Sequence, residues 1–418
     1  MTTSFSLFVK SLASNTARLT SGSPSSVGKL TLVLGNESAD LDSMASSISL
    51  AYTLTQAGEI PAIPIINVNR SDLALRPDCG LLLSTTLQAS GASIQDLTFI
   101  DDFDLRSVVK HYEPAENYVV PGELEVWLAD HNAPASRQQY LEPFVKGIVD
   151  HHVDEGRCLS AQTRIIDMVG SCATLVGTMI REKEELIDPV LAKMILSPIL
   201  VDTANLSPTA MKATDKDRAC VSWLFPQVQW SDVSVSADKD DDAPLTLDVQ
   251  NTTELYKTLD KLKGQVSHLS SRDLLRKDYK QWQVSDLSGI VWNVGISSVA
   301  YRLKKWIKRD GQTTIVDAVD RWIEDQGLDI ALVMNHGKVK ENGVKTYGRD
   351  LVVAFSASKE NRSLSIIDSL VKTDLNLVPY VGTNDTGLVR FYSQLKTEAS
   401  RKQVFPTVKQ VIESDRSP

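Results

Sequence analysis

The sequence predicts an α/β protein of two domains, with a mostly parallel sheet and helices on both of its faces in the first domain and a smaller α/β fold in the second. Apolar runs alternate with helix-like stretches, and the 418 residues exceed the size of one ordinary core. An acidic segment, residues 231–254, carries seven acidic residues against one basic residue and predicts a solvated linker. The expected domains are therefore 1–230 and 255–418.

The first domain begins with an apolar run that predicts a buried strand, followed by a polar loop and a helical stretch. Repeated alternation of this kind is typical of parallel strands covered on both faces, so ligands are expected beyond the carboxyl ends of the strands. Strands are expected at 29–35, 62–67, 97–101, 124–130 and 147–150, and helices at 43–56, 172–183 and 189–196.

The chain beyond the linker shows the same mixture of patterns. Strands are expected at 289–299, 328–335 and 351–356, and helices at 313–326 and 363–372. These elements predict a second α/β domain.

Composition narrows the class of protein. Hydrophobic residues make up 42% of the chain and charged residues 23%, and no apolar run is long enough to cross a bilayer. The four cysteines show no C-x-x-C spacing, which fits a reducing compartment. A net charge of −9 argues against a general nucleic-acid coat protein. We therefore expect a cytoplasmic monomer that binds neither nucleic acid nor membrane.

The first 36 residues contain no acidic residue and are rich in serine and threonine, which loosely resembles a mitochondrial transit peptide. The alternative is a short amphipathic helix packed on the first domain. Its apolar face would consist of Phe5, Leu7, Phe8, Leu12 and Leu19.

Four clusters of acidic or histidine residues each follow a strand or close a helix in the first domain. They are Asp40 with Asp42, Asp130, the run Asp150-His151-His152, and Asp202. A single aspartate at a strand end is more often a turn or cap residue, but adjacent histidines behind a buried strand are uncommon. Together these groups supply donors for two metal ions about 3.5–4 Å apart, which activate a water and steady the oxygens of an in-line displacement. Phosphoanhydride hydrolysis suits such a site because it needs positioning and charge neutralisation.

The ordered set of Asp-x-Asp-Ser at 40–43, Asp-His-Asn at 130–132, Asp-His-His at 150–152 and Asp-Thr at 202–203 resembles the DHH phosphoesterase superfamily. The segments 274–280 (Leu-Leu-Arg-Lys-Asp-Tyr-Lys) and 400–403 (Ser-Arg-Lys-Gln) are similar to the C-terminal domain of its pyrophosphatase branch. The resemblance implies a two-domain fold with the active site in the cleft between the domains.

Within that superfamily the sequence is most similar to the cytosolic exopolyphosphatases. The similarity includes Gly-Asn-Glu-Ser-Ala-Asp at 35–40, Ile-Pro-Ile-Ile at 63–66, Arg-x-Asp-Leu-x-Leu-Arg at 70–76 and Gly-Ser-Cys at 170–172. A prune-type protein is expected to replace the second histidine of the Asp-His-His motif, which is present here as His152.

The resemblance implies two divalent cations, Mg²⁺ or Mn²⁺. It assigns Asp40, Asp130 and Asn36 to one ion and Asp42, Asp130, His151 and Asp202 to the other, so that Asp130 bridges the pair as a catalytic residue. The pyrophosphatase branch is expected to carry histidine where this chain has Asn36. An amide oxygen is a harder and weaker ligand than an imidazole, which shifts that site toward Mg²⁺ with Mn²⁺ still accepted.

The resemblance also implies residues that contact the substrate. His152 faces the substrate and, as a catalytic residue, hydrogen-bonds or protonates the oxygen near the scissile bond. Lys280, Arg401 and Lys402 are expected to hold substrate phosphates. His336, at the end of a predicted strand, is a further candidate for the lining of the cleft.

The function implied by the resemblance is that of an exopolyphosphatase, which releases terminal orthophosphate from inorganic polyphosphate. The alternative enzyme is an inorganic pyrophosphatase or a prune-like nucleotide phosphodiesterase that uses the same metals. An alternative of another class is a non-catalytic scaffold that only binds phosphate, against which the complete set of metal donors argues.

Overall fold

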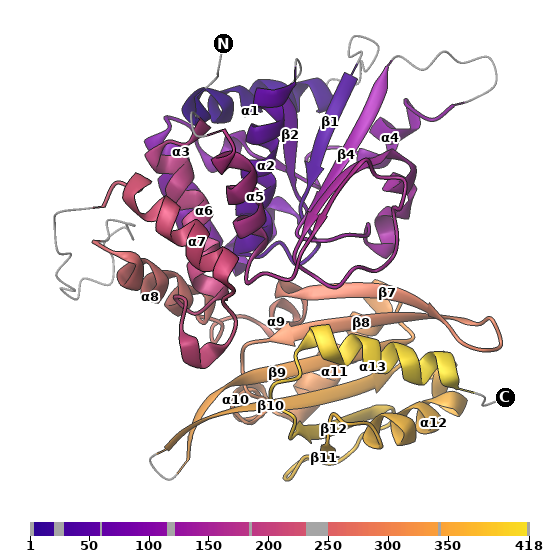
Figure 1. Cartoon of the computed structure of the whole chain (residues 1–418). Helices are drawn as coiled ribbons and strands as arrows, with labels where there is room; N and C mark the ends of the chain where they lie inside the picture. Colours follow the sequence, from indigo (N-terminus) through magenta and orange to yellow (C-terminus); the bar gives the residue numbers. More distant parts are fainter. Residues whose placement is uncertain are drawn as a thin grey trace. The chain divides into compact units, whose positions relative to one another are not determined.

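The computed structural model of the protein describes residues 4–20, 29–58, 61–114, 122–183, 186–230, 250–341 and 344–415. The chain divides into two compact units, Met1–Lys263 (unit 1) and Gly264–Pro418 (unit 2), each built on a sheet covered by helices (Figure 1). Each unit is described here by itself. No helix in the described ranges is long and apolar enough to cross a membrane.

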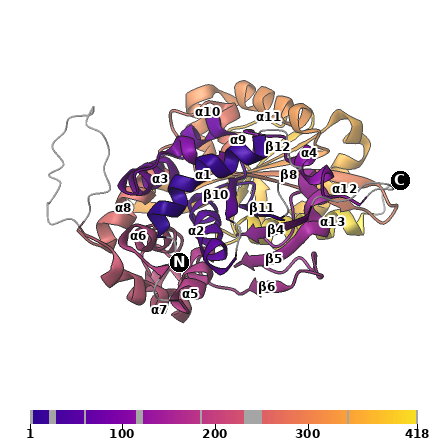
Figure 2. The same cartoon turned by 90° about the horizontal axis from the view of Figure 1, so that it is seen from above.

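Unit 1 contains a six-stranded sheet in the order β3-β2-β1-β4-β5-β6, in which every neighbouring pair is parallel. The strands are β1 (Lys29–Leu34), β2 (Ala62–Ile66), β3 (Thr98–Phe99), β4 (Glu123–Ala129), β5 (Val145–Asp150) and β6 (Thr163–Ile166). Figure 2 shows β4, β5 and β6 side by side. Strands β2 and β3 lie on one side of β1, and β4 to β6 lie on the other. The carboxyl ends of β1 and β4 therefore meet where the strand order reverses, which is where open α/β sheets bind ligands.

Both faces of this sheet are buried, as the sequence predicts. Along β1, Leu30, Leu32 and Leu34 belong to a core shared with α4, whereas Val33 belongs to the core formed by most of the other helices. The apolar runs in the sequence reflect this burial on both sides. The helices of unit 1 are α1 (Phe5–Thr20), α2 (Leu41–Ala57), α3 (Pro77–Ala89), α4 (Leu105–Lys110), α5 (Cys172–Arg181), α6 (Pro189–Asp202), α7 (Asp215–Leu224) and α8 (Thr252–Lys263).

The N-terminal segment forms the amphipathic helix α1, packed on the core of unit 1. Phe5, Phe8 and Leu12 are fully buried, and the ring of Phe5 meets the ring of Tyr52 edge-on at 5.3 Å between centroids. The expectation for Leu7 is wrong, since 58% of this residue is exposed. Buried positions follow the i, i+3, i+4 spacing, which places Leu7 on the opposite side of the helix.

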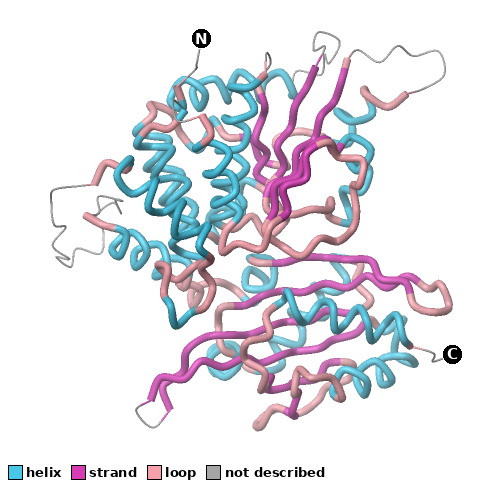
Figure 3. The backbone as a smooth tube through the Cα atoms, viewed as in Figure 1, coloured by secondary structure: helices cyan, strands magenta, loops and turns pink. Residues whose placement is uncertain are grey.

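Unit 2 contains a mixed sheet in the order β11-β12-β10-β9-β8-β7, in which only β8 and β9 are parallel neighbours. Its strands are β7 (Tyr279–Ser285), β8 (Val291–Val299), β9 (Ile330–Glu341), β10 (Val344–Phe355), β11 (Leu377–Pro379) and β12 (Val389–Gln394). Its helices are α9 (Ser271–Lys277), α10 (Leu303–Asp310), α11 (Gln312–Gln326), α12 (Glu360–Val371) and α13 (Arg401–Ser414). Helices α12 and α13 cover one face of this sheet. Figure 3 shows the long strands β9 and β10 lying side by side.

The predicted linker, residues 231–254, lies largely outside the described residues, because 231–249 are not described. The chain is described again from Gln250 and enters α8, which packs on α3 and α6. Helix α8 buries Leu255, Leu259 and Leu262 in the core of unit 1. The division between the units therefore falls after Lys263, and the predicted boundary at 255 lies within a helix of unit 1.

Candidate metal centre

The loop after β1, which carries Asn36 and Asp40, is fixed by buried contacts at the switch point. The buried guanidinium of Arg76 donates two hydrogen bonds to the carbonyl oxygen of Ser38, at 3.1 and 2.7 Å. At Gly35 a Cβ atom would lie 2.7 Å from Ser43 Oγ, so glycine is required where the chain passes the start of α2. Asp40 then caps α2 by accepting a hydrogen bond from Ser43 N at 3.1 Å.

Asp42 lies buried in the first turn of α2. Its carboxylate accepts hydrogen bonds from the backbone N–H groups of Cys172 and Ala173, at 2.6 and 2.9 Å, and from Ser46 Oγ at 3.0 Å. Cys172 and Ala173 begin α5, and the N-terminus of a helix favours a negative charge. Burial raises the pKa of Asp42, whereas the nearby His151 and these N–H groups lower it.

Asp130 follows β4 with a left-handed backbone, φ 64°, and is 2% exposed. Its Oδ2 atom accepts a hydrogen bond from Asn36 Nδ2 at 2.6 Å. Its buried Oδ1 atom makes no hydrogen bond within the described structure and lies 3.4 Å from His151 Nε2 and 3.6 Å from His152 Nδ1. Burial, and then the charge of Asp42, raises the pKa of Asp130 well above its ordinary value. A buried carboxylate oxygen without a donor fits a site for a cation.

Asp150, the last residue of β5, orients both histidines. One of its oxygens accepts from the backbone N–H of His151 at 2.8 Å and from Nδ1 of His152 at 2.7 Å, and the other accepts from Asn132 Nδ2 at 2.6 Å. Burial alone would raise the pKa of Asp150, but the hydrogen bond from His152 and the other contacts lower it overall. His151 Nδ1 lies 2.9 Å from the carbonyl oxygen of Val169, an interaction that leaves Nε2 facing the carboxylates.

Asn36 contacts the centre through its amide nitrogen. Its amide oxygen accepts hydrogen bonds from the backbone N–H groups of Ser38 and Ala39, at 2.9 and 3.0 Å. Both groups are donors, so the oxygen must face them and the nitrogen must face Asp130. The expected role of Asn36 as a metal ligand requires its side chain to turn and stays a prediction.

Asp202 is the last residue of α6 and lies 3.5 Å from the ammonium group of Lys263, at the end of α8. Burial raises the pKa of Asp202 to about 6, while Lys263 opposes that rise and Asp42 and Asp40 add to it. Three consecutive left-handed residues, 204–206, follow the helix. This turn ends α6 with Asp202 directed toward the other carboxylates and Lys263.

A divalent metal fits the residues brought together in unit 1. Ligand atoms of Asp130, His151 and His152 all lie within 4.8 Å of one another. Carboxylate oxygens suit Mg²⁺ and Mn²⁺, and imidazole suits transition metals. Asp42 and Asp202 are electrostatically coupled to this group and to Asp40.

Apart from His152, the expected substrate residues lie in unit 2. Arg401, the first residue of α13, pairs with Asp278 Oδ1 at 2.7 Å and donates to the carbonyl oxygen of the same residue at 3.1 Å. Lys280 lies in β7 and is partly exposed, and Lys402 is exposed in the first turn of α13. His336 lies in β9, inside a longer strand than the one predicted to end before it.

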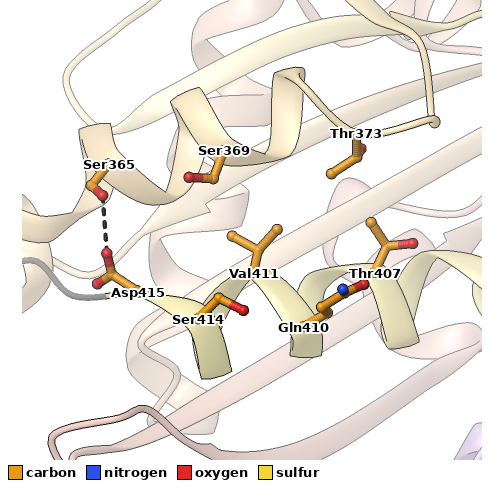
Figure 4. Close-up of a pocket in the computed structure, with 8 residues that line it drawn as sticks. All are labelled: Ser365, Ser369, Thr373, Thr407, Gln410, Val411, Ser414 and Asp415. Atoms are coloured by element: carbon orange, nitrogen blue, oxygen red, sulfur yellow. Dashed lines mark hydrogen bonds between the residues drawn. The ribbon is translucent and has the colours of Figure 1, made fainter.

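A polar pocket between α12 and α13 contains none of the predicted site residues (Figure 4). It is lined by Ser365, Ser369, Thr373, Thr407, Gln410, Val411, Ser414 and Asp415. The charge of Asp415 is satisfied by the buried Arg362, at 2.5 Å, and by the hydroxyl of Ser365. The pocket offers no metal donor set.

Comparison with known proteins identifies the family. Residues 31–201 match the family described as "DHH family, N-terminal domain", and residues 257–411 match the "DHHA2 domain". The chain is 33% identical, over 94% of each chain, to a Schizosaccharomyces pombe protein named "Putative exopolyphosphatase". The chain belongs to the DHH phosphoesterase family. The predicted motifs at 40–43, 130–132 and 150–152 all lie within the matched DHH domain.

Other proteins to which the chain is similar are named as exopolyphosphatases or pyrophosphatases. The chain is 27% identical to mouse "Exopolyphosphatase PRUNE1", over 92% of this chain and 75% of that one. It is 28% identical, over 42% of its length and 51% of the relative's, to a "Probable manganese-dependent inorganic pyrophosphatase" of Deinococcus radiodurans. A Methanococcus jannaschii "putative family II inorganic pyrophosphatase" shares the fold with a TM-score of 0.57 at 20% identity, covering 92% of this chain and 99% of that one.

The structure also shows residues that the sequence analysis did not assign to the site. Asp150 and Asn132 belong to the quoted motifs, but their positioning contacts depend on how β4 and β5 are paired. Lys263 lies in a helix with no motif of its own. The only feature of the sequence that points to Lys263 is the basic last turn of this helix, which contains Lys261 and Lys263.

Proposed function

We propose that this DHH phosphoesterase hydrolyses the terminal phosphoanhydride bond of inorganic polyphosphate and depends on two divalent cations, Mg²⁺ or Mn²⁺. The observation that carries the proposal is the buried Asp130 Oδ1 atom at the switch point, which lies 3.4 and 3.6 Å from nitrogens of two histidines and makes no well-aligned hydrogen bond among the described residues. The names of the relatives that match over more than 90% of this chain favour polyphosphate, and that of the pyrophosphatase relative favours manganese.

Asp40, Asp42, Asp130, His151 and Asp202 would hold the cations, with Asp130 shared between them. When bound, two such ions lower the pKa of the attacking water and neutralise phosphate charge. The oxygen of a water molecule would bond to the terminal phosphorus and release its proton to solvent, while the bridging P–O bond breaks. The electron pair of the broken bond stays on the oxygen of the shortened chain.

His152 is placed to stabilise that leaving oxygen. It is 25% exposed at its side chain, and its Nδ1 atom is bound to Asp150, so Nε2 is the atom available to substrate. The carboxylate of Asp150 favours a protonated imidazole and holds the ring in one orientation. His152 then donates a hydrogen bond or a proton to the leaving oxygen. Lys280, Arg401 and Lys402 of unit 2 would bind other phosphates of the chain.

Phosphate release from long polyphosphate, tripolyphosphate and pyrophosphate, and cleavage of nucleotides, each with Mg²⁺ or Mn²⁺, test the proposal. We expect release from long polyphosphate and tripolyphosphate to exceed that from pyrophosphate. Fastest release from pyrophosphate would assign a pyrophosphatase, and cleavage of nucleotides alone a phosphodiesterase. Binding of polyphosphate without any release would assign a scaffold.

Two histidine variants localise the chemistry. His152→Gln is expected to lower kcat by roughly a hundredfold to ten-thousandfold, the usual range for an acid or base catalyst. His268→Gln is the matched control, because His268 is exposed and belongs to unit 2. Equal activity of the two variants would contradict the role of His152.

A further inference from the structure

Arg349 lies in β10, next to the part of the strand that is buried in the core of unit 2. Leu351 and Val353, which alternate with it along the strand, are buried in the core that α12 and α13 cover. Arg349 continues the same face, directly opposite His336 of β9. Its side chain is partly buried.

The guanidinium of Arg349 has no carboxylate partner among the described residues. Its Nε atom donates to the carbonyl oxygen of Thr397 at 2.7 Å, and its guanidinium carbon lies 5.5 Å from the ring centroid of Tyr347. Burial lowers the pKa of Arg349. Arg302 of unit 2 differs, since it is neutralised by Asp350 through two hydrogen bonds.

A partly buried arginine without a carboxylate partner is suited to bind an anion that comes from outside the protein. Taking a charge partly out of water costs free energy unless the charge is paired, and neither a carbonyl oxygen nor an aromatic ring supplies a full negative charge. The guanidinium is planar and its two terminal nitrogens match the spacing of phosphate oxygens. Arg401, by contrast, is already paired with Asp278.

Further polar groups lie close to His336, the residue opposite Arg349. The hydroxyl of Tyr347 lies 3.1 Å from His336 Nδ1, and the hydroxyl of Ser298 lies 3.5 Å from His336 Nε2. Ser298 N in turn donates to the carbonyl oxygen of Asp278, the residue that holds Arg401. A chain of contacts thus joins Arg349 to the expected phosphate-binding residues of unit 2.

We infer that Arg349, with Tyr347 and His336, binds phosphoryl oxygens of the polyphosphate chain. This inference rests on the proposed function for the identity of the substrate. It adds a guanidinium that no sequence motif indicates. The two-pronged contact with phosphate is assigned to Arg349, because the guanidinium of Arg401 is also held by Asp278.

Binding of tripolyphosphate to the full-length, metal-free protein in EDTA tests the inference without hydrolysis. Arg349→Gln is expected to weaken the calorimetric dissociation constant at least tenfold, and Arg349→Lys to give a smaller loss. Both losses should shrink as salt rises, because the contact is between charges. Arg272→Gln is the control, since Arg272 is an exposed arginine of unit 2 that is paired with Asp325.

Kinetics with Mg²⁺ separate binding from a structural effect. Arg349→Gln should raise KM for long polyphosphate about tenfold while kcat stays within a factor of about three, and its thermal transition should remain cooperative.

If Arg349→Gln does not fold, the Arg349→Lys variant decides. Binding of tripolyphosphate within twofold of wild type by the folded variant would overturn the inference. If the wild type binds tripolyphosphate through Arg349 but hydrolyses no polyphosphate, the proposed function fails and the binding site stands.

Discussion

Replacing Asp130 by asparagine should abolish hydrolysis and at the same time stabilise the metal-free protein. Asparagine removes a buried negative charge, keeps an oxygen that can accept the hydrogen bond from Asn36, and tolerates the left-handed backbone at this position. Activity is lost while stability is gained because the carboxylate is needed to bind a cation and, without one, destabilises the folded protein.

The magnitude follows from the geometry around His151. Asp130 Oδ1 and Asp42 Oδ2 lie 3.4 and 3.8 Å from the same atom, His151 Nε2. The two oxygens are therefore at most about 7 Å apart, and like charges at that distance repel by about 2 kcal/mol at an effective dielectric constant of about 20. We expect the free energy of unfolding of Asp130→Asn in EDTA to exceed that of wild type by about 2 kcal/mol.

The gain in stability should depend on pH. The pKa of Asp130 is raised in the folded protein, first by burial and then by Asp42, so the folded state holds its proton to higher pH than the unfolded state. The penalty of the charge is absent below the unfolded value of about 4 and grows as the pH rises toward the folded value. The advantage of the variant should follow the same course.

Urea denaturation followed by tryptophan fluorescence, at pH 8 and at pH 4.5 in EDTA, measures this difference. Phosphate release with Mn²⁺ measures the loss of activity. Asp154→Asn is the control, because Asp154 is exposed and paired with Arg164, so its loss brings no gain in stability. An Asp130→Asn protein that is less stable than wild type in EDTA at pH 8 would refute the reasoning.

Three further results are expected. Asn36→His should raise activity with Mn²⁺ or Co²⁺ relative to Mg²⁺, since it supplies a nitrogen ligand, and an unchanged metal ranking would place Asn36 outside the ligand set. Lys263→Met removes the ammonium 3.5 Å from Asp202 and should tighten calorimetric Mn²⁺ binding at least threefold; weaker binding would contradict a competition between the ammonium and the metal. The hydrogen bond from Arg309 lowers the pKa of Asp310 to about 2, so Asp310→Asn should cost about 1–2 kcal/mol at pH 7. That cost should fade in denaturation experiments as the pH falls from about 4 through 2, and a constant cost would exclude the ionic origin.

The sequence could predict the sheet of unit 1 because its strands are buried on both faces. Such strands are apolar throughout, and polar residues stand out where they end. Unit 2 gave weaker signals: β7, with the sequence Tyr-Lys-Gln-Trp-Gln-Val-Ser, is only partly buried along most of its length. The register of β9 with β10 places Arg349 opposite His336, and no local pattern encodes that pairing.

The residues of the candidate centre could be predicted, but their orientation could not. Two backbone N–H groups of its own loop, those of Ser38 and Ala39, decide which atom of the Asn36 amide faces Asp130. The meeting of Asp130 with Asn36 depends on β1 pairing with β4, although the two residues are 94 positions apart in the sequence. The cytoplasmic location, the monomeric state and the cleft between domains stay predictions.

Helix α8 has a consequence for any attempt to study the first unit alone. A fragment that stops at residue 254, the end of the predicted linker, would uncover the sites on α3 and α6 where Leu255, Leu259 and Leu262 pack. It would also strip Asp202 of its ammonium partner, leaving the acidic centre with one cation fewer. A fragment that is to report faithfully on metal affinity must therefore extend through Lys263, although the matched DHH domain ends at residue 201.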